Sequence, residues 1–580
     1  MIKKLAKSIR QYKKASILSP VFMAFEVTME VLIPFLMANL IDLGITGGNM
    51  DYIVKMSIVL FLAALLSLGF GIMSGIFAAT ASAGFAGNLR HDMYRNVQNF
   101  SFSNIDKFST ASLVTRLTTD VTNLQNAYQM IIRQAVRAPL MIILALSMSF
   151  RVNAKISLIF LGAIPVLGLG LFFIHSSVHP IFTRAFKRYD KLNSVVQENL
   201  HGIRVVKSYV REEMEKEKFE AISNDIYTDF TKAQKRVAFN APLIQLCVNA
   251  CMILIAWIGA KLIVGGTMST GELMSIIAYT MQILMSLNLL SMVFVMIIIS
   301  RVSAERIVQV LEEESDLKNP EHPVMAVKDG GIVFKNVSFS YRNDESRPCL
   351  CGVDLEISSG ETIGIIGGTG SSKTSFVQLI PRLYDVTTGA VLIGGVDVRN
   401  YDIEALRSEV AVVLQKNLLF SGSIKDNLRW GDADADDEEI RRVSRLAQAD
   451  DFVISFIDGY DTYIEQGGTN VSGGQKQRLC IARALLKKPK ILILDDSTSA
   501  VDTKTDSLIR KALKEEIPNT TKLIIAQRIS SIQDADRIIV MDGGLINAVG
   551  THDELLSSNQ IYKEVYNSQI QGGGDFDAEK

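Results

Sequence analysis

The chain has 580 residues, of which 48% are hydrophobic and 21% charged, and its mean hydropathy is +0.23. This composition excludes a disordered, a collagen-like or a disulfide-stabilised protein, and a net charge of −1 gives no overall positive field for nucleic acid. Residues 1–325 carry 31 Lys and Arg against 23 Asp and Glu, whereas residues 326–580 carry 29 against 38. Because the long apolar runs also fall in the first part, we expect a membrane domain followed by a soluble, acidic domain.

Six apolar segments are long enough to cross the core of a bilayer, for which a helix needs about 20 residues. They lie at 16–41, 53–82, 126–150, 155–175, 241–264 and 273–299. The basic residues before the first segment and within 83–125 and 176–240 place these parts in the cytoplasm by the positive-inside rule. Six crossings return the chain to the cytoplasm, so we expect the second half there as well.

The two long cytoplasmic connections are predicted to be helical. Residues 88–130 and 186–230 contain no proline and keep helical periodicity, which indicates helices that continue beyond the bilayer. Their turning points, near Ser109–Arg116 and His201–Tyr209, are expected to form short contact helices. A linker at 320–329 then separates a membrane domain at 1–319 from a second domain at 330–570, which is followed by a polar tail at 571–580.

Two acidic residues, Glu26 and Glu30, stand four residues apart on one face of the first span. An acid within a membrane span costs about 2.5–3.5 kcal/mol on insertion scales, so it should face a cavity or a partner. The pair is therefore either a site for a cationic substrate or the partner of Arg133 and Arg137 in the third span, which are also four residues apart.

Sulfur-containing residues cluster in the last two spans. Five methionines share one face of the sixth span, where they indicate either an adaptable substrate surface or ordinary packing and lipid contact. They are Met274, Met281, Met285, Met292 and Met296. Cys247 and Cys251 in the fifth span are expected to be buried packing residues. No Cys or His spacing matches a zinc site, so we expect no such metal centre.

The second half contains a phosphate-binding pattern. The segment ETIGIIGGTGSSKTSFVQLI reads as a strand, a Gly-rich turn and a helix, and it nearly matches G-x-x-x-x-G-K-[ST]. The backbone N–H groups of such a turn bind nucleotide phosphates, Lys373 neutralises them and Thr374 binds Mg²⁺. Ser372 replaces the last glycine and narrows the backbone freedom of the turn. The expected nucleotide-binding residues here are Gly367, Gly368, Thr369, Gly370, Ser371, Ser372, Lys373, Thr374 and Ser375.

Two further motifs follow in a fixed order. About 120 residues later, KKPKILILDDSTSAVD gives an apolar strand that ends in Asp495, a carboxylate positioned to hold Mg²⁺. Between the two motifs, Ser472, Gly473, Gly474 and Gln475 open a helix, whose N-terminus is a second anion-binding position.

With these motifs in this order, nearly the whole chain resembles the ATP-binding cassette (ABC) exporters. The resemblance implies a type IV exporter-like membrane domain of six helices, with Ser109–Arg116 and His201–Tyr209 as its coupling helices. It also implies a nucleotide-binding domain at 330–570 with an α/β P-loop ATPase fold. In this family two cassettes dimerise head to tail, and each ATP lies between the P-loop of one chain and the signature of the other.

The resemblance also assigns single residues. Tyr341 matches the aromatic residue that stacks on adenine, and Gln415 matches the Q-loop ligand of Mg²⁺. Ser472–Gln475 match the signature, with Val471 in place of the usual Leu. Asp502 matches the D-loop, and Glu465 falls in the segment that resembles the X-loop.

Two departures from the family pattern concern catalysis. Asp496 stands where the family has the Glu that orients the attacking water, and Gln527 stands where it has the switch His. The shorter side chain withdraws the carboxylate by about 1.5 Å, and a misplacement near 1 Å can cost on the order of 10²-fold in rate. A Gln cannot become an imidazolium. Both changes fall in the site that uses the P-loop of this chain, whereas the signature is intact.

With changes in the site of its own P-loop and an intact signature, the chain resembles the weaker-site subunit of bacterial heterodimeric multidrug exporters. We therefore expect ATP-driven export of amphipathic small molecules, with ATP and Mg²⁺ as cofactors. The expected partners are a second half-transporter, the lipid bilayer and the substrate, but no nucleic acid. The chain is expected in a bacterial cell membrane, with its N-terminus and its nucleotide-binding domain in the cytoplasm. A lipid flippase, a nucleotide-sensing channel or regulator, and a homodimer with slow hydrolysis at two sites are the alternatives.

Overall fold

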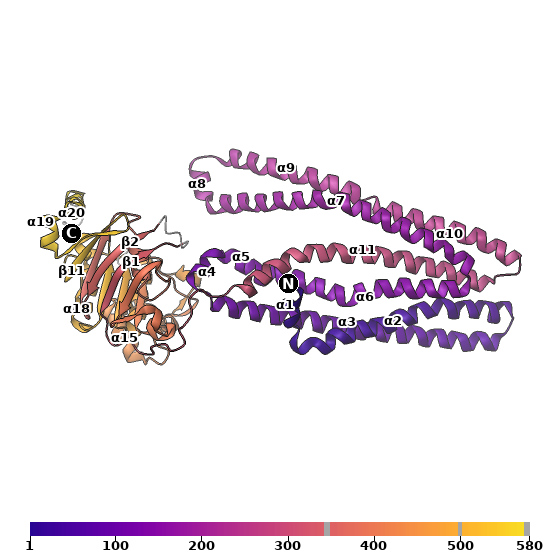
Figure 1. Ribbon diagram of the computed structural model, residues 1–580, viewed down its shortest axis with the longest axis horizontal. Coiled ribbons are helices and arrows are strands. Elements are labelled where there is room, and N and C mark those ends of the chain that lie inside the picture. The colour runs from indigo at the N-terminus through magenta and orange to yellow at the C-terminus, as the bar shows by residue number, and fades with distance from the viewer. Residues whose placement is uncertain (342–347, 497–500, 573–580) are drawn as a thin grey trace. The chain divides into compact units, whose positions relative to one another are not determined.

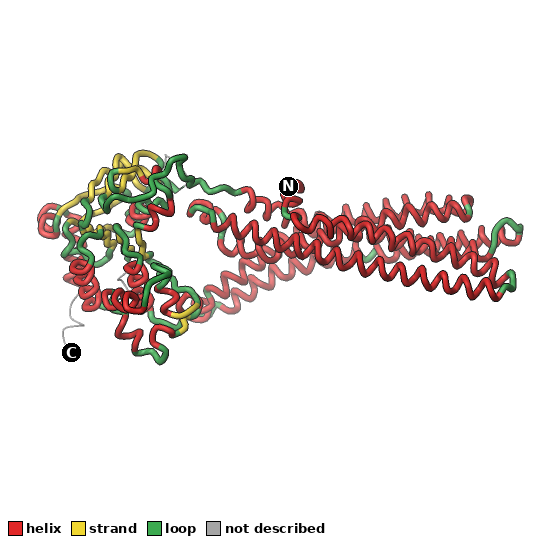
Figure 2. Tube along the Cα trace, turned by 90° about the horizontal axis from the view of Figure 1, so that it is seen from below, coloured by secondary structure: helices red, strands yellow, loops and turns green. Residues whose placement is uncertain are grey.

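The computed structural model describes residues 1–341, 348–496 and 501–572 (Figure 1). The chain forms two structural units, which we call the membrane unit (Met1–Gln98 with Thr110–Glu313) and the cassette unit (Asn99–Ser109 with Glu314–Lys580). Figure 2 shows that the described strands all belong to the cassette unit. The predicted polar tail lies outside the described residues from position 573 onward.

The membrane unit is built from α-helices that range from 6 to 49 residues in length. They are α1 (Ile2–Lys7), α2 (Lys13–Asn39), α3 (Met50–Gln98), α5 (Thr110–Thr115), α6 (Val121–Val152), α7 (Ala154–His201), α8 (Ile203–Ser208), α9 (Glu212–Val237), α10 (Asn240–Val264) and α11 (Thr270–Glu312). Six helical segments of the described chain are long and apolar enough to cross a membrane: Arg10–Thr46, Met50–Gln98, Thr110–Val152, Ala154–Phe182, Glu212–Val264 and Thr270–Glu312. Each contains one predicted span, so the prediction of six is confirmed.

The connections between the spans are helical, as predicted. Helix α3 continues to Gln98 and α7 to His201, and the short helices α5 and α8 lie at the two predicted turning points. An additional short helix, α4 (Phe102–Lys107), precedes α5 and belongs to the cassette unit. The sequence analysis did not predict α4, because it read this segment as part of one continuous helix.

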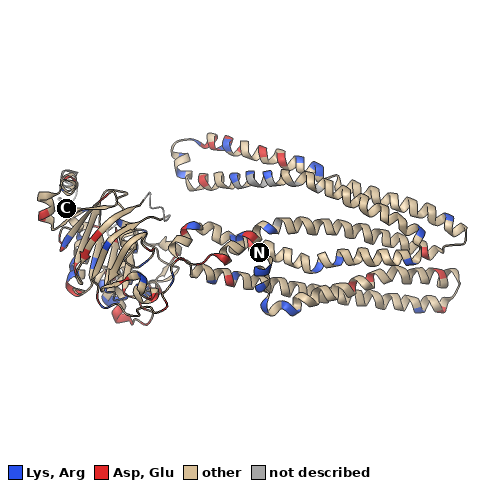
Figure 3. Ribbon diagram, in the orientation of Figure 1, with Lys and Arg blue, Asp and Glu red and all other residues tan. Residues whose placement is uncertain are grey.

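The membrane unit has a core shared by α2, α6, α7, α10 and α11. Cys247 and Cys251 are buried in it as free thiols, which confirms their packing role. In Figure 3 most charged residues of this unit gather toward one end of its helices and few lie along the rest. This distribution is typical of helices whose middle part crosses an apolar layer.

The cassette unit contains two main sheets. The strands are β1 (Ile332–Phe339), β2 (Leu350–Ile357), β3 (Thr362–Gly367), β4 (Thr388–Ile393), β5 (Val396–Asp397), β6 (Val410–Val413), β7 (Gly422–Ser423), β8 (Tyr463–Ile464), β9 (Ile491–Asp495), β10 (Thr521–Ile525), β11 (Arg537–Asp542) and β12 (Leu545–Gly550). One sheet is antiparallel with the order β2-β1-β4-β5, and the other has the order β12-β11-β3-β10-β9-β6. Every residue of β9 and β10 is buried, as expected for parallel strands covered on both faces.

Helices cover the sheets of the cassette unit. They are α12 (Lys373–Gln378), α13 (Ile403–Ser408), α14 (Ile424–Leu428), α15 (Asp437–Leu446), α16 (Asp450–Ile454), α17 (Gly473–Leu486), α18 (Thr503–Glu516), α19 (His552–Ser558) and α20 (Gln560–Gly572). Within 320–329, which we predicted as a linker, Val324 pairs with Tyr401 and Val327 is buried in the core of this unit.

Candidate nucleotide site and membrane cavity

The predicted nucleotide motifs meet at one edge of the larger sheet. Strands β3, β10, β9 and β6 run parallel to one another, so their carboxyl ends share that edge. The phosphate-binding turn follows β3, Gln527 follows β10, Asp495 and Asp496 end β9, and Gln415 follows β6. Segments more than 150 residues apart in the sequence are thus placed side by side, where ligands of such sheets bind.

The phosphate-binding turn, Gly367–Ser375, is closed by its own lysine. The Nζ atom of Lys373 donates to the carbonyl oxygens of Gly367 at 2.9 Å and Gly368 at 2.8 Å, and to Oγ of Ser371 at 3.1 Å. Gly367 is required, because a Cβ there would lie 2.1 Å from the carbonyl oxygen of Met541. The lysine therefore lies over the turn, ready to exchange its carbonyl partners for phosphate oxygens.

Ser372 adopts a left-handed backbone conformation, with φ 70° and ψ 22°. This region favours glycine, because a Cβ crowds the following carbonyl group. The replacement of the usual glycine thus places a strained residue at the start of α12, as its identity indicated. Such strain costs on the order of 1–3 kcal/mol.

Oxygen donors suited to Mg²⁺ lie next to the turn. Burial raises the pKa of the Asp495 carboxyl, and the neighbouring Asp496 adds to this rise, while a hydrogen bond from Thr374 and the charge of Lys373 act against it. Burial also lowers the pKa of Lys373, which the two carboxylates oppose. Hydroxyl, carboxylate and amide oxygens are the donors that Mg²⁺ prefers, so Thr374, Asp495 and Gln415 fit this ion.

Asp496 is held by side chains from neighbouring strands. The amide of Gln527 donates to Oδ2 of Asp496 at 2.8 Å, and the amide of Gln415 donates to the same oxygen at 3.4 Å. The buried amide of Gln477 donates to the backbone carbonyl of Asp496 at 3.3 Å. Asp496 itself has a φ of 48°. The two residues that depart from the family pattern therefore bind each other directly.

The predicted adenine-contacting residue, Tyr341, lies beside α12, the helix that follows the phosphate-binding turn. Its hydroxyl shares a hydrogen bond with Oγ of Ser375 at 2.8 Å, and 47% of its surface is exposed. The ring of Tyr384 meets the Tyr341 ring edge-on, with centroids 5.1 Å apart. An exposed aromatic ring beside a phosphate-binding turn can stack on a base.

The signature residues form the N-terminus of α17. Oγ of Ser472 accepts from the backbone N–H of Gln475, and the side chain of Gln475 accepts from the backbone N–H of Ser472. Gly473 and Gly474 form the first turn. Asp502 caps α18 by accepting from the backbone N–H of Thr505, and Glu465 accepts from the hydroxyl of Thr469. Among the described hydrogen bonds, none joins Ser472–Gln475 to the phosphate-binding turn of the same chain.

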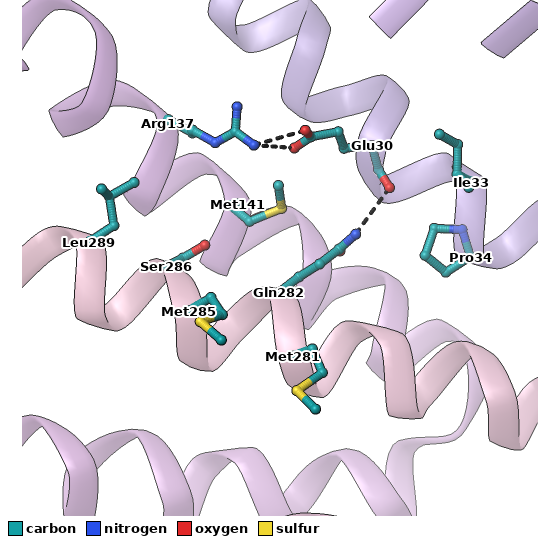
Figure 4. A pocket seen from close by; sticks show the side chains of 10 residues that line it. All are labelled: Glu30, Ile33, Pro34, Arg137, Met141, Met281, Gln282, Met285, Ser286 and Leu289. Atoms are coloured by element: carbon teal, nitrogen blue, oxygen red, sulfur yellow. Dashed lines mark hydrogen bonds and ion pairs between the residues drawn. The ribbon is translucent and has the colours of Figure 1, made fainter. Parts of the chain in front are cut away.

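The acidic pair of α2 is bound to α6. Arg137 donates to Glu26 at 2.6 Å and to both carboxylate oxygens of Glu30 at 2.8 Å. The pairing that the sequence left open is thus formed with Arg137. Figure 4 shows this contact at one side of a cavity between α2, α6 and α11, where Gln282 also donates to the backbone of Glu30. Within the described part of the chain, the second oxygen of Glu26, Oε2, is buried and has no hydrogen-bond partner.

The cavity has a volume of about 460 Å³ and a mostly apolar lining. Its walls are Glu30, Ile33, Pro34, Arg137, Met141, Met281, Gln282, Met285, Ser286 and Leu289. Met281 and Met285 come from the predicted methionine face, while Glu26 lies outside this lining. The arrangement combines an adaptable apolar surface with one polar end, as small-molecule sites do.

Comparisons with known proteins identify the family. Residues 16–287 match the model for the ABC transporter transmembrane region, and residues 350–499 match the model for the ABC transporter. The chain is 36% identical over 562 residues to the uncharacterized ABC transporter ATP-binding protein YfiB of Bacillus subtilis, with 97% of each chain covered. The chain belongs to the ABC transporter family.

Further relatives fit this assignment. The ABC transporter is 34% identical over 572 residues to the uncharacterized protein YknU of Bacillus subtilis, covering 96% of this chain and 95% of YknU. It is 32% identical over 488 residues to the ATP-dependent lipid A-core flippase of Desulfotalea psychrophila, covering 83% of this chain and 84% of that protein. The solved structure of a bacterial Atm1-family ABC exporter with ATP bound has the same fold, with a TM-score of 0.83 at 22% identity, covering 96% and 99% of the two chains.

These findings confirm the predicted architecture and activity class. This ABC transporter has the exporter fold, in which a six-helix membrane domain is fused to an ATP-binding domain. It is an ATPase coupled to transport. Exporters of this family act as dimers that span the lipid bilayer, and the relatives named above are bacterial proteins.

The sequence analysis missed two residues of the ABC transporter site, Gln477 and Tyr384. It gave Ser375 as a nucleotide-binding residue but did not predict its contact with Tyr341. The sequence could have indicated Gln477, because it is a polar residue on the face of α17 that packs against the core and is otherwise apolar. The contacts of Ser375 and Tyr384 depend on tertiary packing, for which the sequence contains no comparable pattern.

Proposed function

We propose that this chain is one half of a heterodimeric exporter of amphipathic small molecules, and that its own ATP site hydrolyses slowly. The observation that carries this proposal is the 2.8 Å hydrogen bond from Gln527 to Asp496. A carboxylate that is one methylene shorter than Glu, and engaged by an amide, is poorly placed to activate water. In this proposal, the nucleotide-binding residues keep the roles that the resemblance to ABC exporters implies for them.

The chemistry of hydrolysis explains why the ATP site of this chain is slow. A water oxygen bonds to the γ-phosphorus, the bond to the oxygen between the β- and γ-phosphates breaks, and a water proton passes to a base. Asp496 is the base in this site, but the amide N–H groups of Gln527 and Gln415 compete with water for its Oδ2 atom. Thr374, Asp495 and Gln415 would hold Mg²⁺, which when bound would neutralise charge at the phosphate oxygens.

The intact signature completes the other site of the dimer. Ser472–Gln475 present a capped helix N-terminus, which favours anions through its free N–H groups and its dipole. Hydrolysis at the site that combines this signature with the partner's P-loop then drives the cycle. This assignment places the cassette and the N-terminus in the cytoplasm and the spans in the cell membrane, with 1–319 and 330–570 as the two domains.

The cavity between α2, α6 and α11 is the proposed substrate site. Its methionines adapt to different apolar groups, and the Glu30–Arg137 pair, Gln282 and Ser286 provide hydrogen-bonding groups at one side. These features fit a small amphipathic molecule of the multidrug type better than a large polar one. Lipid flipping is the second candidate, because one relative is a lipid A-core flippase.

Transport by the reconstituted dimer tests the proposal. ATP and Mg²⁺ are added to the medium outside inverted vesicles. Uptake of the amphipathic dye Hoechst 33342 is then compared with flipping of a fluorescent phospholipid. We expect uphill dye uptake that stops when ATP is withheld. Phospholipid flipping without dye uptake would replace the small-molecule assignment with a flippase. Dye flux that only follows its gradient would indicate a channel.

A further inference from the structure

The C-terminal helix α20 is anchored in the core of the cassette unit. Tyr562 is fully buried there, Val565 packs against the same core, and the hydroxyl of Tyr562 shares a hydrogen bond with Nδ1 of His552 at 2.7 Å. Gln569 follows Val565 by four residues and so lies on the same face of the helix, but its side chain is exposed. The anchored helix therefore holds an exposed amide close to the neighbouring backbone.

The amide of Gln569 binds the backbone of residues 527–531, which we call the switch segment. Its Nε2 atom donates to the carbonyl oxygen of Gln527 at 2.7 Å, and its Oε1 atom accepts from the backbone N–H of Ile529 at 2.9 Å. Arg528 between them is extended, with φ −98° and ψ 129°, so these two backbone groups point to the same side. A Gln side chain offers a donor and an acceptor together, so it pairs with them as a neighbouring strand would.

The switch segment is held at both of its ends. At one end, Oγ of Ser531 donates to Oδ2 of Asp506 at 3.0 Å. The bonds from α20 hold the other end, where the amide of Gln527 donates to Oδ2 of Asp496 at 2.8 Å. A continuous set of hydrogen bonds within the cassette unit thus joins α20 to the carboxylate at the end of β9.

We propose that Gln569 is a positioning residue for ATP hydrolysis at the site that uses the P-loop of this chain. By fixing the backbone of the switch segment, it keeps the amide of Gln527 on Asp496. This inference rests on the proposed role of Asp496 as the base. Without Gln569 the backbone at Gln527 gains freedom, its amide occupies Oδ2 of Asp496 for less of the time, and water reaches that oxygen more often. Helix α20 therefore helps to keep this site slow.

Single-turnover hydrolysis by the full chain in lipid nanodiscs tests the inference. The transporter is in excess over Mg²⁺-ATP radiolabelled at its γ-phosphate, and a series of transporter concentrations separates the rate constant from the half-saturating concentration. Gln569→Met keeps the length of the side chain but loses both hydrogen bonds. We expect its rate constant to rise about three- to fivefold and the half-saturating concentration to stay within about twofold. A fall in the rate constant would show a purely structural role and would overturn the inference.

The matched control is Gln560→Met on the same helix. The amide of Gln560 donates to Glu564 within α20 and makes no described bond to the switch segment. This variant should keep the rate constant of the parent chain. It should also keep the parent's hydrogen exchange at 527–531, whereas Gln569→Met should speed that exchange about tenfold because the N–H of Ile529 loses its acceptor. Equal effects of the two variants would contradict the role of Gln569.

Gln527→Leu separates this inference from the proposed function. It removes the amide itself, so it should raise the rate constant at least about threefold, and adding Gln569→Met should change it by less than about 1.5-fold further. A rise in Gln527→Leu without one in Gln569→Met, or independent effects in the double variant, would overturn the role of Gln569 alone. An unchanged rate in Gln527→Leu would contradict the proposed engagement of Asp496, and the inference with it.

Discussion

At the scale of residues, two substitutions in the family pattern act on one another. Asp496 and Gln527 come from the ends of adjacent parallel strands, and the amide of Gln527 donates to the carboxylate that we propose as the base. Gln415 shares this carboxylate oxygen. The sequence indicated each departure separately, whereas the hydrogen bond between them depends on strand order, which no local pattern specifies.

Ser372 leads to a prediction about stability. Its φ of 70° is unfavourable for any residue except glycine, so Ser372→Gly should stabilise the cassette by about 1 kcal/mol after the added freedom of the unfolded chain is subtracted. The thermal unfolding midpoint of the purified transporter should rise by about 2–4 °C, as measured by intrinsic fluorescence.

The control for this prediction is Gly370→Ala in the same turn. Gly370 has a φ of 86°, so the added Cβ should lower the unfolding midpoint. Equal midpoints for Ser372→Gly and the parent chain would show that the turn does not hold Ser372 under strain.

At the scale of elements, the helices of the membrane unit follow directly from apolar length and charge. All six spans and the short helices α5 and α8 could be predicted, because a bilayer requires continuous apolar helices and their periodicity persists outside it. Helix α4 could not be predicted in this way. Its identity depends on the side-chain cap of Ser101 and on contacts with Tyr384 and Asp316, which lie more than 200 residues away.

The cavity leads to a prediction at the same scale. Met285 lines it from α11, so Met285→Trp should fill part of the 460 Å³ and weaken substrate binding. The concentration of Hoechst 33342 that gives half-maximal stimulation of the ATPase should rise about tenfold or more, with little change in the unstimulated rate.

Met274→Trp is the matched control, because Met274 is exposed on the same helix but does not line the cavity. It should leave the half-maximal concentration within about twofold of the parent value. Similar effects of both substitutions would place the substrate elsewhere on α11.

At the scale of the whole molecule, the proposed function assigns the signature and the P-loop of this chain to different sites of the dimer. The family pattern predicted this division, and the described hydrogen bonds of Ser472–Gln475 run within their own helix end. A single chain can therefore be intact for one site and impaired for the other. Neither the substrate nor the partner chain follows from such motifs, because both depend on surfaces that many sequences can form.

This division predicts unequal effects of two substitutions in the heterodimer. Gly473→Glu puts a negative charge where the signature meets ATP, so it should reduce ATP turnover at least about 100-fold by blocking the active site. Lys373→Ala affects the slow site and should reduce turnover by less than about threefold. Phosphate release by the co-expressed dimer measures both, and equal losses would contradict the asymmetric assignment.

The most direct measurement is the ATPase rate of this chain purified alone in lipid, beside its Asp496→Glu variant. We predict a rate near background for the parent chain and an increase on the order of tenfold or more for Asp496→Glu, because the longer side chain restores the reach of the carboxylate. A high rate for the parent chain that Asp496→Glu leaves unchanged would contradict the slow site and would establish a working homodimer.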